Sequence, residues 1–449
     1  MISPPATQTQ HAFVRTNLRH NMRCSVVDGW FYMVMFGLAE TFFALFILEM
    51  FESPVASGLI LTVPLMLASL AQLASPNITR WAGSYRTIVT ATAWLQAIAC
   101  IPLAIIAFRG SAPMWLVFVI VTIYHCGAIV GGAPWSTLMS LLVPGPLRAR
   151  FFAARNRKLQ VGAMIGVAIG ALLLEYSTAW MPKLIPLLSN IGLHVPESWS
   201  TRPQLPAFGV LFLLATAARA VSAAYLGLHK EPQHASSSLR ILSVTELLDR
   251  VRKGPGAALI ARLCTFQFAM MIGSPFWAAY VKDIAHASFL HWAAMIICWM
   301  LGRALVVGWA GEIAAKHGRD RLILMAALLM APCPALWTFS TNIGWLVIAQ
   351  LFCGMAIACW DLSVWLSTVS TFPEEERTSM LAKFGLLQYT SGAAGSYAGG
   401  AMLKQMGDTR VAFIATFLAS TLARTLVLVW IALPHHREKA RTQPTASAK

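Results

Sequence analysis

Long apolar runs alternate with short polar turns along the whole chain, and this pattern predicts helices that cross a membrane. A helix of about 20 apolar residues crosses the hydrocarbon core of a bilayer. Runs of that length recur through the 449 residues and predict twelve spans. Their approximate limits are 27–48, 53–75, 87–108, 113–142, 158–178, 206–228, 257–282, 287–310, 321–340, 343–370, 379–404 and 410–433. The expected fold class is an all-α polytopic membrane protein.

A polar segment in the middle of the chain divides these spans into two groups of six. Within it, Ser243 and Glu246 have the spacing of a capping box, which predicts a short helix. That helix is either amphipathic and bound to the inner membrane surface or a solvated linker. The expected domains are a tail at 1–26, an N-terminal six-helix bundle at 27–228, the central loop at 229–256, a C-terminal six-helix bundle at 257–433 and a basic tail at 434–449.

The basic residues predict the orientation of the spans. Most of the 34 Lys and Arg residues fall in segments that are cytoplasmic if both termini are inside. Basic loops remain on the inner side of a membrane, so both termini are expected in the cytoplasm. The net charge of +16 does not indicate nucleic-acid binding, because the basic residues lie between apolar runs and not on one face of a soluble fold.

Other signals argue against several classes of function. The eight cysteines are scattered without a CxxC pair, which argues against disulfides and metal sites. The chain has no HExxH, Gly-x-Ser-x-Gly or P-loop pattern. We therefore expect no enzyme, no cofactor and no metal.

Two pairs of segments repeat between the halves. The sixth span contains FLLATAAR at Phe212–Arg219, and the twelfth contains FLASTLAR at Phe417–Arg424. The loops after the fourth and tenth spans both begin with Pro-x-x-x-Arg, ending at Arg148 and Arg377. Repeated halves with the substrate bound between them are typical of secondary transporters.

A charged turn at 311–321 joins the eighth and ninth spans, and a worn copy that contains Arg80 lies at 79–86. It resembles the signature loop of the major facilitator superfamily of transporters, Gly-x-x-x-Asp-Arg-x-Gly-Arg-Arg/Lys. The matching positions are Gly311, Gly318 and Arg319, with Lys316 as a like-charge substitute. Ala315 stands in place of the family's aspartate, and Asp320 in place of its last basic residue.

The resemblance implies a fold of twelve helices in two pseudo-symmetric bundles. It also implies that the inner corners at Arg80, Arg148 and Arg377 belong to the gate. Because Ala315 replaces the acid, a charge latch at this turn must use Glu312 or Asp320. The segment 148–157 also resembles the loop of uncharacterised bacterial members, which implies the family's fold and no substrate. The expected location is a bacterial inner membrane.

Ionisable groups in the predicted spans are the first candidates for function, because they are costly in a membrane. Glu40 lies near the middle of the first span, where it is either a proton carrier or a structural carboxyl. His125 lies at similar depth in the fourth span and is either a proton relay or substrate contact or a neutral, hydrogen-bonded histidine. Arg303 and Asp361 lie near the inner ends of their spans, where they form either a gating ion pair or a static one.

Other residues in the spans are weaker candidates for function. Gln267, Trp360 and Trp365 are candidate substrate contacts, although aromatic residues in such helices mostly pack. Arg219 and Arg424 are equivalent in the repeat and are expected to extend to the inner surface. Glycines at four-residue spacing in the fifth span and a group of closely spaced glycines in the eleventh predict close helix contacts, which we expect to slide between the halves. They are Gly162, Gly166 and Gly170, and Gly392, Gly395, Gly399 and Gly400.

The sequence therefore predicts a monomeric secondary active transporter that works by alternating access. The expected partners are protons, the lipid bilayer and a small solute that is uncharged, amphiphilic or weakly charged. One alternative is a transporter-like sensor or scaffold, because both signature loops lack the aspartate. A membrane-embedded enzyme is the other.

Overall fold

The computed structural model describes residues 5–190, 195–196, 198–231, 257–371 and 377–432. Within these ranges the chain is helical and contains no strand. It divides into two compact units, Met1–Ile241 with His286–Ile297, and Leu242–Ala285 with Cys298–Lys449. The predicted helix at Ser243 and the tail at 434–449 lie outside the described residues.

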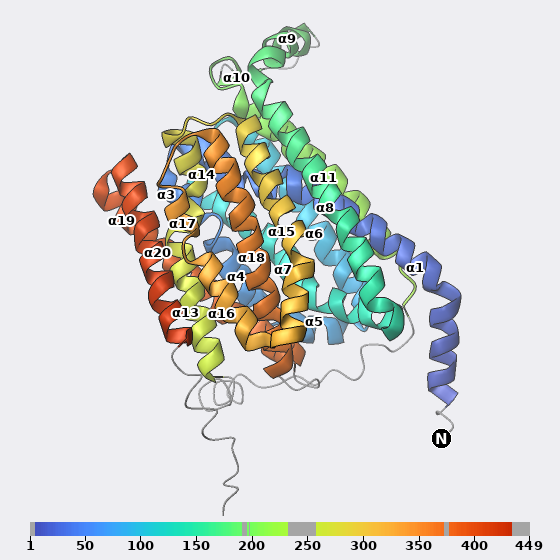
Figure 1. The fold of residues 1–449 in the computed structure, drawn as a ribbon. Coiled ribbons are helices and arrows are strands. Elements are labelled where there is room, and N and C mark those ends of the chain that lie inside the picture. Colours follow the sequence, from blue (N-terminus) through green and yellow to red (C-terminus); the bar gives the residue numbers. More distant parts are fainter. Residues whose placement is uncertain (1–4, 191–194, 197, 232–256, 372–376, 433–449) are drawn as a thin grey trace, which may run out of the picture. The chain divides into compact units, whose positions relative to one another are not determined.

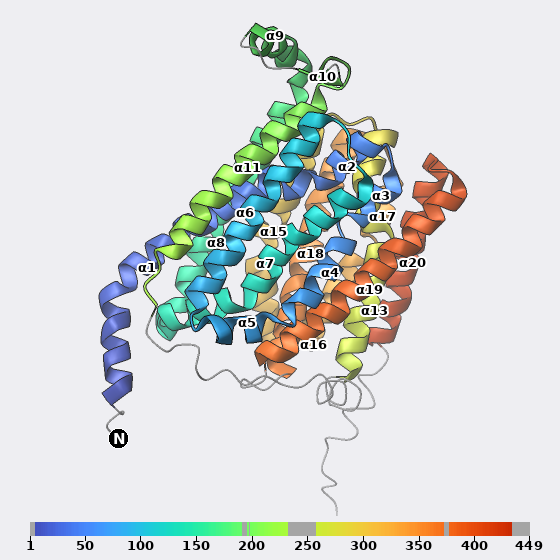
Figure 2. The same cartoon turned by 180° about the vertical axis from the view of Figure 1, so that it is seen from behind.

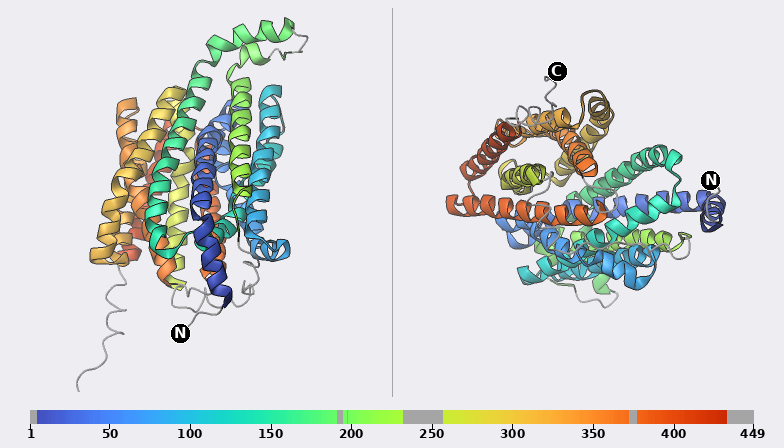
Figure 3. Two further views of the ribbon diagram at one scale, coloured as in Figure 1. Left: turned by 90° about the vertical axis from the view of Figure 1, so that its right-hand side faces the viewer. Right: turned by 90° about the horizontal axis from the view of Figure 1, so that it is seen from below.

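The first unit contains the N-terminal helices (Figure 1). They are α1 (Pro5–Leu38), a 3-10 turn (Glu40–Phe42), α2 (Phe43–Phe51), α3 (Pro54–Leu59), α4 (Val63–Gln72), α5 (Ser75–Ala82), α6 (Tyr85–Arg109), α7 (Met114–Leu142), α8 (Gly145–Glu175), α9 (Ser177–Asn190), α10 (Ser198–Thr201) and α11 (Gln204–Gly227). Helices α6, α7 and α11 lie side by side (Figure 2), and α1 packs on α8 and α11. The short α9 and α10 project beyond the ends of α8 and α11 (Figure 3).

The second unit holds the C-terminal helices. They are α13 (Ala257–Gly273), a 3-10 turn (Ser274–Phe276), α14 (Trp277–Ala279), a π-helical turn (Tyr280–Ile284), most of α15 (Phe289–His317), α16 (Arg319–Met330), α17 (Cys333–Leu336), α18 (Ile343–Thr371), α19 (Arg377–Met406) and α20 (Arg410–Ala432). Helix α13 packs on α19 and α20, and α16 packs on α18.

Ten helices of the described chain are long and apolar enough to cross a membrane, two fewer than the twelve predicted spans. The predicted span 321–340 is interrupted, because α16 ends at Met330 and prolines follow at Pro332 and Pro334. The predicted span 379–404 is one long helix, α19, but its many Gly, Ser and Thr residues lower its hydropathy. The first helix differs too, since the predicted tail is helical from Pro5.

The two halves share two local features. The first helix of each half is broken by a 3-10 turn, at Glu40 in one and at Ser274 in the other. Each also has a helix–helix turn around a glycine with positive φ, Gly83 at +68° and Gly318 at +81°. A side chain at these φ values is strained, so glycine permits both turns. The structure thus extends the internal repeat beyond the sequence matches.

The glycine faces of α8 and α19 pack inside their own units. A Cβ added at Gly166 of α8 would meet the backbone of Val34 and Gly37 in α1. A Cβ added at Gly395 of α19 would meet the carbonyl oxygen of Phe268 in α13. The close helix contacts that the sequence predicted are therefore present, but they join helices of one half and are not the expected sliding surface.

Replacement of Gly395 by alanine tests this packing. We expect Gly395→Ala to destabilise the protein by about 1–3 kcal/mol, because α19 must move away from the Phe268 carbonyl. The apparent melting temperature in detergent, followed by tryptophan fluorescence, should fall. Gly308→Ala in α15 is the matched control, since an added Cβ there meets nothing within 4 Å. Equal melting temperatures for the two variants would contradict the packing role.

Candidate functional site

Glu40 lies in the break between α1 and α2. Its Oε2 atom accepts a hydrogen bond from the Tyr124 hydroxyl of α7 at 3.1 Å, and that hydroxyl oxygen also lies 2.9 Å from Met35 Sδ. The break is supported by Thr41, whose hydroxyl donates to the Gly37 carbonyl at 2.8 Å. Among the described residues no cation lies within ion-pair distance of Glu40. The carboxyl is therefore held by one neutral donor at an interruption of the helix.

His125 belongs to the same cluster through aromatic contacts. Its ring is 3 % exposed and meets the rings of Tyr124 and Phe43 edge to face, at centroid distances of 5.2 and 6.2 Å. No hydrogen bond joins the imidazole to another described residue. The structure therefore brings Glu40 and His125 to one cluster, in which the histidine packs among rings.

In the second unit, Arg303 of α15 and Asp361 of α18 form an ion pair. The Arg303 Nη1 atom lies 2.9 Å from Asp361 Oδ2, and the guanidinium lies over the Trp299 ring at 4.9 Å. The two side chains are 29 % and 50 % exposed. This pair connects two helices of one unit and is partly exposed.

The three candidate substrate contacts of this unit have different environments. The Trp360 ring is 2 % exposed and stacked on Phe266 at 4.1 Å, so its surroundings are those of a core residue. Gln267 of α13 lies against Gly392 of α19. Trp365 is 58 % exposed.

The signature loop has an exposed ion pair within one helix. Glu312 lies 3.6 Å from Lys316 one turn later in α15, and both side chains are about 70 % exposed. The turn itself is made at Gly318, and Gly311 and Asp320 are exposed. In the N-terminal copy, Arg80 is exposed in the last turn of α5. The side chains of Arg148, Arg319 and Arg377 lie outside the described part of the chain.

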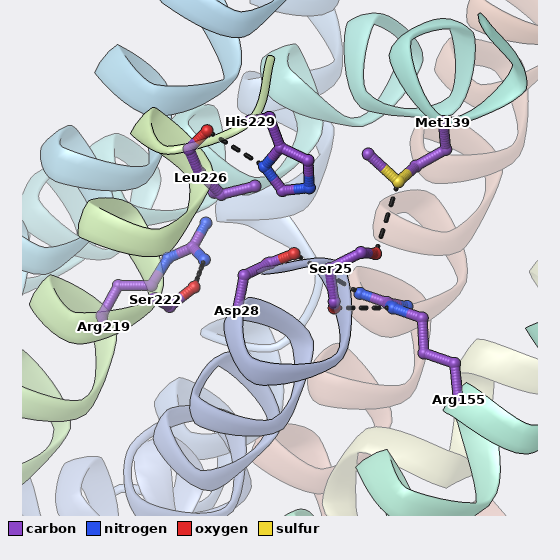
Figure 4. A network of polar contacts seen from close by, with 8 residues as sticks. All are labelled: Ser25, Asp28, Met139, Arg155, Arg219, Ser222, Leu226 and His229. Carbon is purple, nitrogen blue, oxygen red and sulfur yellow. Dashed lines mark hydrogen bonds and ion pairs between the residues drawn. The ribbon is translucent and has the colours of Figure 1, made fainter. Parts of the chain in front are cut away.

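A buried charged cluster that the sequence did not predict lies at one end of the first unit (Figure 4). Arg155 of α8 donates from Nε to the Ser25 carbonyl at 2.9 Å, and its Nη2 lies 3.8 Å from Asp28 Oδ2. Arg219 of α11 donates from Nη1 to Ser222 Oγ at 2.7 Å. Each guanidinium also lies over an aromatic ring. These contacts are Arg155 over Trp135 at 4.9 Å and Arg219 over Tyr32 at 4.7 Å.

A cavity of about 210 Å³ adjoins this cluster. Its polar walls are Asp28, Arg155, Arg219, Tyr32, Thr92 and Trp135. Much of the remaining wall is formed by apolar side chains and by the glycines of α7.

His229, which follows the end of α11, lies beside this cluster (Figure 4). Its Nδ1 lies 3.1 Å from the Leu226 carbonyl oxygen, and burial lowers the pKa of the imidazole to about 4, so the ring is neutral at pH 7. The next residues are fixed as well, because the Glu231 carboxylate accepts hydrogen bonds from the N–H groups of Tyr85 and Arg86 at the start of α6.

The sequence did contain a signal for this cluster. Asp28 is the only acid in the first 39 residues and falls one residue inside the predicted span 27–48. Arg155 lies in the basic segment between the predicted spans 113–142 and 158–178, where a positive charge is expected. Only the fold shows that α1, α8 and α11 bring these groups together.

The expectation that Arg219 and Arg424 extend to the membrane surface is wrong. Arg424 is 1 % exposed and donates to the carbonyl oxygens of Met330 and Met270 and to Ser274 Oγ, at 2.8, 3.0 and 2.8 Å. It therefore ties the broken first helix of the second unit to the end of α16. Arg219 is 6 % exposed. Because both arginines find acceptors inside their units, neither needs to reach water.

Comparison with known proteins agrees with this architecture. The sequence profile described as Major Facilitator Superfamily matches residues 258–448, and a search of curated proteins finds no match.

The nucleoside transporter NupG is 10% identical, with 92% of this chain and 98% of that chain covered and a TM-score of 0.65. A D-xylose–proton symporter is 16% identical, with 94% and 97% covered and a TM-score of 0.65. The E. coli fucose:proton symporter FucP is 13% identical, with 94% and 98% covered and a TM-score of 0.59. Residues 258–448 are thus similar in sequence to the major facilitator superfamily, and nearly the whole chain has the fold of these solved transporters.

Proposed function

We propose that this protein is a proton-coupled secondary transporter that moves a small organic solute across a membrane by alternating access. The observation that carries the proposal is the Glu40 carboxyl, which lies at the break of the first helix with one hydrogen bond from Tyr124. Intramembrane acids are rare and costly, and they often mark proton pathways. Broken helices in transporters often mark binding sites.

The surroundings of Glu40 suit a group that gains and loses a proton. A carboxyl paired with arginine stays ionised, whereas no described cation lies within ion-pair distance of Glu40. The Tyr124 hydroxyl can donate to the carboxylate or accept from the carboxylic acid. Both protonation states of Glu40 therefore keep a partner at the same place.

The named activities of similar structures support this proposal. Two of the similar proteins are sugar–proton symporters and a third is a nucleoside transporter. By analogy, we propose twelve membrane-spanning helices in two six-helix bundles, with α16–α17 and α19 as the two helices beyond the ten apolar ones. We also propose cytoplasmic termini, a bacterial inner-membrane location and a monomer.

Glu40→Gln tests proton coupling. Purified protein in liposomes that contain a pH-sensitive dye is given nucleosides, pentoses, hexoses and small monocarboxylates in turn. We expect at least one solute to move protons in the wild type. Glu40→Gln should reduce this proton movement about tenfold or more, the effect of about 1.4 kcal/mol on a barrier. Exchange of the same labelled solute without a pH gradient should persist, because the amide keeps the size of the carboxyl.

Glu52→Gln is the matched control for that experiment. Glu52 follows α2, is 74 % exposed and pairs with Arg202 at 2.8 Å, so its neutralisation should leave coupling unchanged. Intact proton movement in Glu40→Gln would overturn the assignment of Glu40. Absence of flux with every solute class would favour the sensor or scaffold.

Asp361→Asn tests whether the Arg303–Asp361 pair acts as a latch. Because the pair is partly exposed, it should be worth at most about 1 kcal/mol, so its loss should change the ratio of open states about two- to fivefold. The readout is maleimide labelling of one cysteine introduced on the inner face, in a variant that lacks the eight native cysteines. The swap of Arg303→Asp with Asp361→Arg should restore the original rate.

Glu312→Gln is the comparison for the latch. Its partner Lys316 lies in the same helix, so the loss of this pair frees no second helix. An equal change in Glu312→Gln, with none in Asp361→Asn, would move the latch to the signature loop.

A further inference from the structure

The cavity of the first unit has more positive than negative charge in its wall. Its charged groups are Arg155, Arg219 and Asp28, which are 6 %, 6 % and 3 % exposed. Two guanidinium groups face one carboxylate, and His229 beside them is neutral at pH 7. One positive charge is therefore left without a partner among the described residues. A buried charge of this kind is costly unless an anion compensates it.

Three polar atoms of this cluster also lack hydrogen bonds. Among the described residues, Arg219 Nε, Asp28 Oδ2 and His229 Nε2 are buried and have no hydrogen-bond partner. Asp28 lies between the two arginines (Figure 4), but its nearest contact to Arg155 is 3.8 Å, too long for a hydrogen bond. Arg219 has an N–H available for another acceptor, and Asp28 does not fill that role.

The equivalent arginine of the repeat shows how such a group is satisfied when its role is structural. Arg424 uses its two terminal nitrogens on three acceptors, which belong to Met330, Met270 and Ser274. Arg219 has one hydrogen-bond acceptor, Ser222, and lies beside the cavity. The Nε atom of each arginine has no partner among the described residues, so the two differ in their terminal nitrogens. Those of Arg424 bond to other helices of its half, whereas Arg219 bonds only to Ser222 of its own helix.

The rest of the cavity wall indicates what accompanies the anionic group. Met33, Val89, Leu159 and Leu226 contribute apolar surface. Gly132 leaves room along α7, because a Cβ added there would meet nothing within 4 Å. A volume of about 210 Å³ is well above the roughly 10–15 Å³ that a single water needs, so the cavity has room for one small organic molecule. Gly132 is exposed, so the cavity has an opening.

We infer that this cavity binds a small organic monocarboxylate, with its carboxylate on Arg219 and Arg155 and its apolar body against the wall of α7. A single negative charge matches the surplus of one positive charge. Planar guanidinium groups suit carboxylates because they donate parallel hydrogen bonds. The binding site stands by itself, whereas the identification of this ligand as the transported solute rests on the proposed function.

Thermal stability of the purified protein tests the site without requiring flux. The probes are propanoate, butanoate and benzoate, each compared with its neutral amide, and inorganic phosphate. A ligand that binds the folded state raises the apparent melting temperature in proportion to the logarithm of its concentration. We expect the carboxylates to stabilise the wild type, the amides to have little effect, and phosphate, which has no apolar body, to act more weakly.

Two substitutions should change the carboxylate response in opposite directions. Arg219→Met removes the unsatisfied donor and should weaken carboxylate binding about tenfold or more, as expected for a lost charge-assisted hydrogen bond. Asp28→Asn removes the competing carboxylate and should strengthen binding. Arg424→Met is the control, because it should lower the melting temperature without ligand and leave the carboxylate response of the folded fraction unchanged.

Several outcomes would overturn the inference. They are stabilisation by the amides as large as by the carboxylates, an equal response to phosphate, no response of the wild type, or an unchanged response in both Arg219→Met and Asp28→Asn. If Arg219→Met does not fold, the sign of the Asp28→Asn effect decides. Carboxylate binding without flux of any solute would leave the site in place and refute the transport function. Flux of neutral solutes without carboxylate binding would do the reverse.

Discussion

Ionisable side chains inside membrane-spanning helices must find partners within the protein, because the surrounding hydrocarbon offers none. Arg424 meets this requirement with three acceptors from the broken first helix and the end of α16. Its counterpart Arg219 meets it with one serine and an aromatic ring. Arg424 therefore holds helices of its half together, whereas the hydrogen bond of Arg219 stays within its own helix.

The same requirement shapes the first helix of each half. A 3-10 break leaves polar backbone groups within an apolar segment, and each unit covers its break differently. In the second unit Arg424 reaches Ser274 at the break. In the first unit the Thr41 hydroxyl donates to the Gly37 carbonyl at the break, and the buried Tyr124 hydroxyl donates to the Glu40 carboxylate. The glycine contacts of α8 and α19 hold these interrupted helices from the side, since backbones can approach closely there.

Much of the fold could be predicted from the sequence, because spans and repeats depend on patterns along the chain. Hydropathy located ten helices that the structure confirms as long and apolar enough to cross a membrane. It could not show that Pro332 and Pro334 interrupt one predicted span, because composition alone does not show where a helix ends. The glycine spacing predicted close contacts but not their partners, since a small-residue stripe fits any helix that approaches it.

The candidate site could be predicted only in part, for a related reason. An ionisable residue within an apolar run can be recognised from the sequence alone, and this identified Glu40, His125, Arg303 and Asp361. Asp28 and Arg155 lie near the ends of their apolar runs, where charge is unremarkable. Their importance arises from α1, α8 and α11 converging, and no local pattern encodes that convergence.

The different hydrogen bonding of Arg219 and Arg424 has a consequence for how this chain could have diversified. When a helical unit is duplicated, each copy inherits the same arginine together with the need to neutralise it. Because Arg424 ties two helices of its half together, substitutions around it cost stability, whereas Arg219 bonds to a serine of its own helix, so substitutions around it can alter chemistry with less loss of the scaffold. The N-terminal half, in which Arg219 keeps a single hydrogen-bond acceptor, is then the half in which new ligand preferences can evolve.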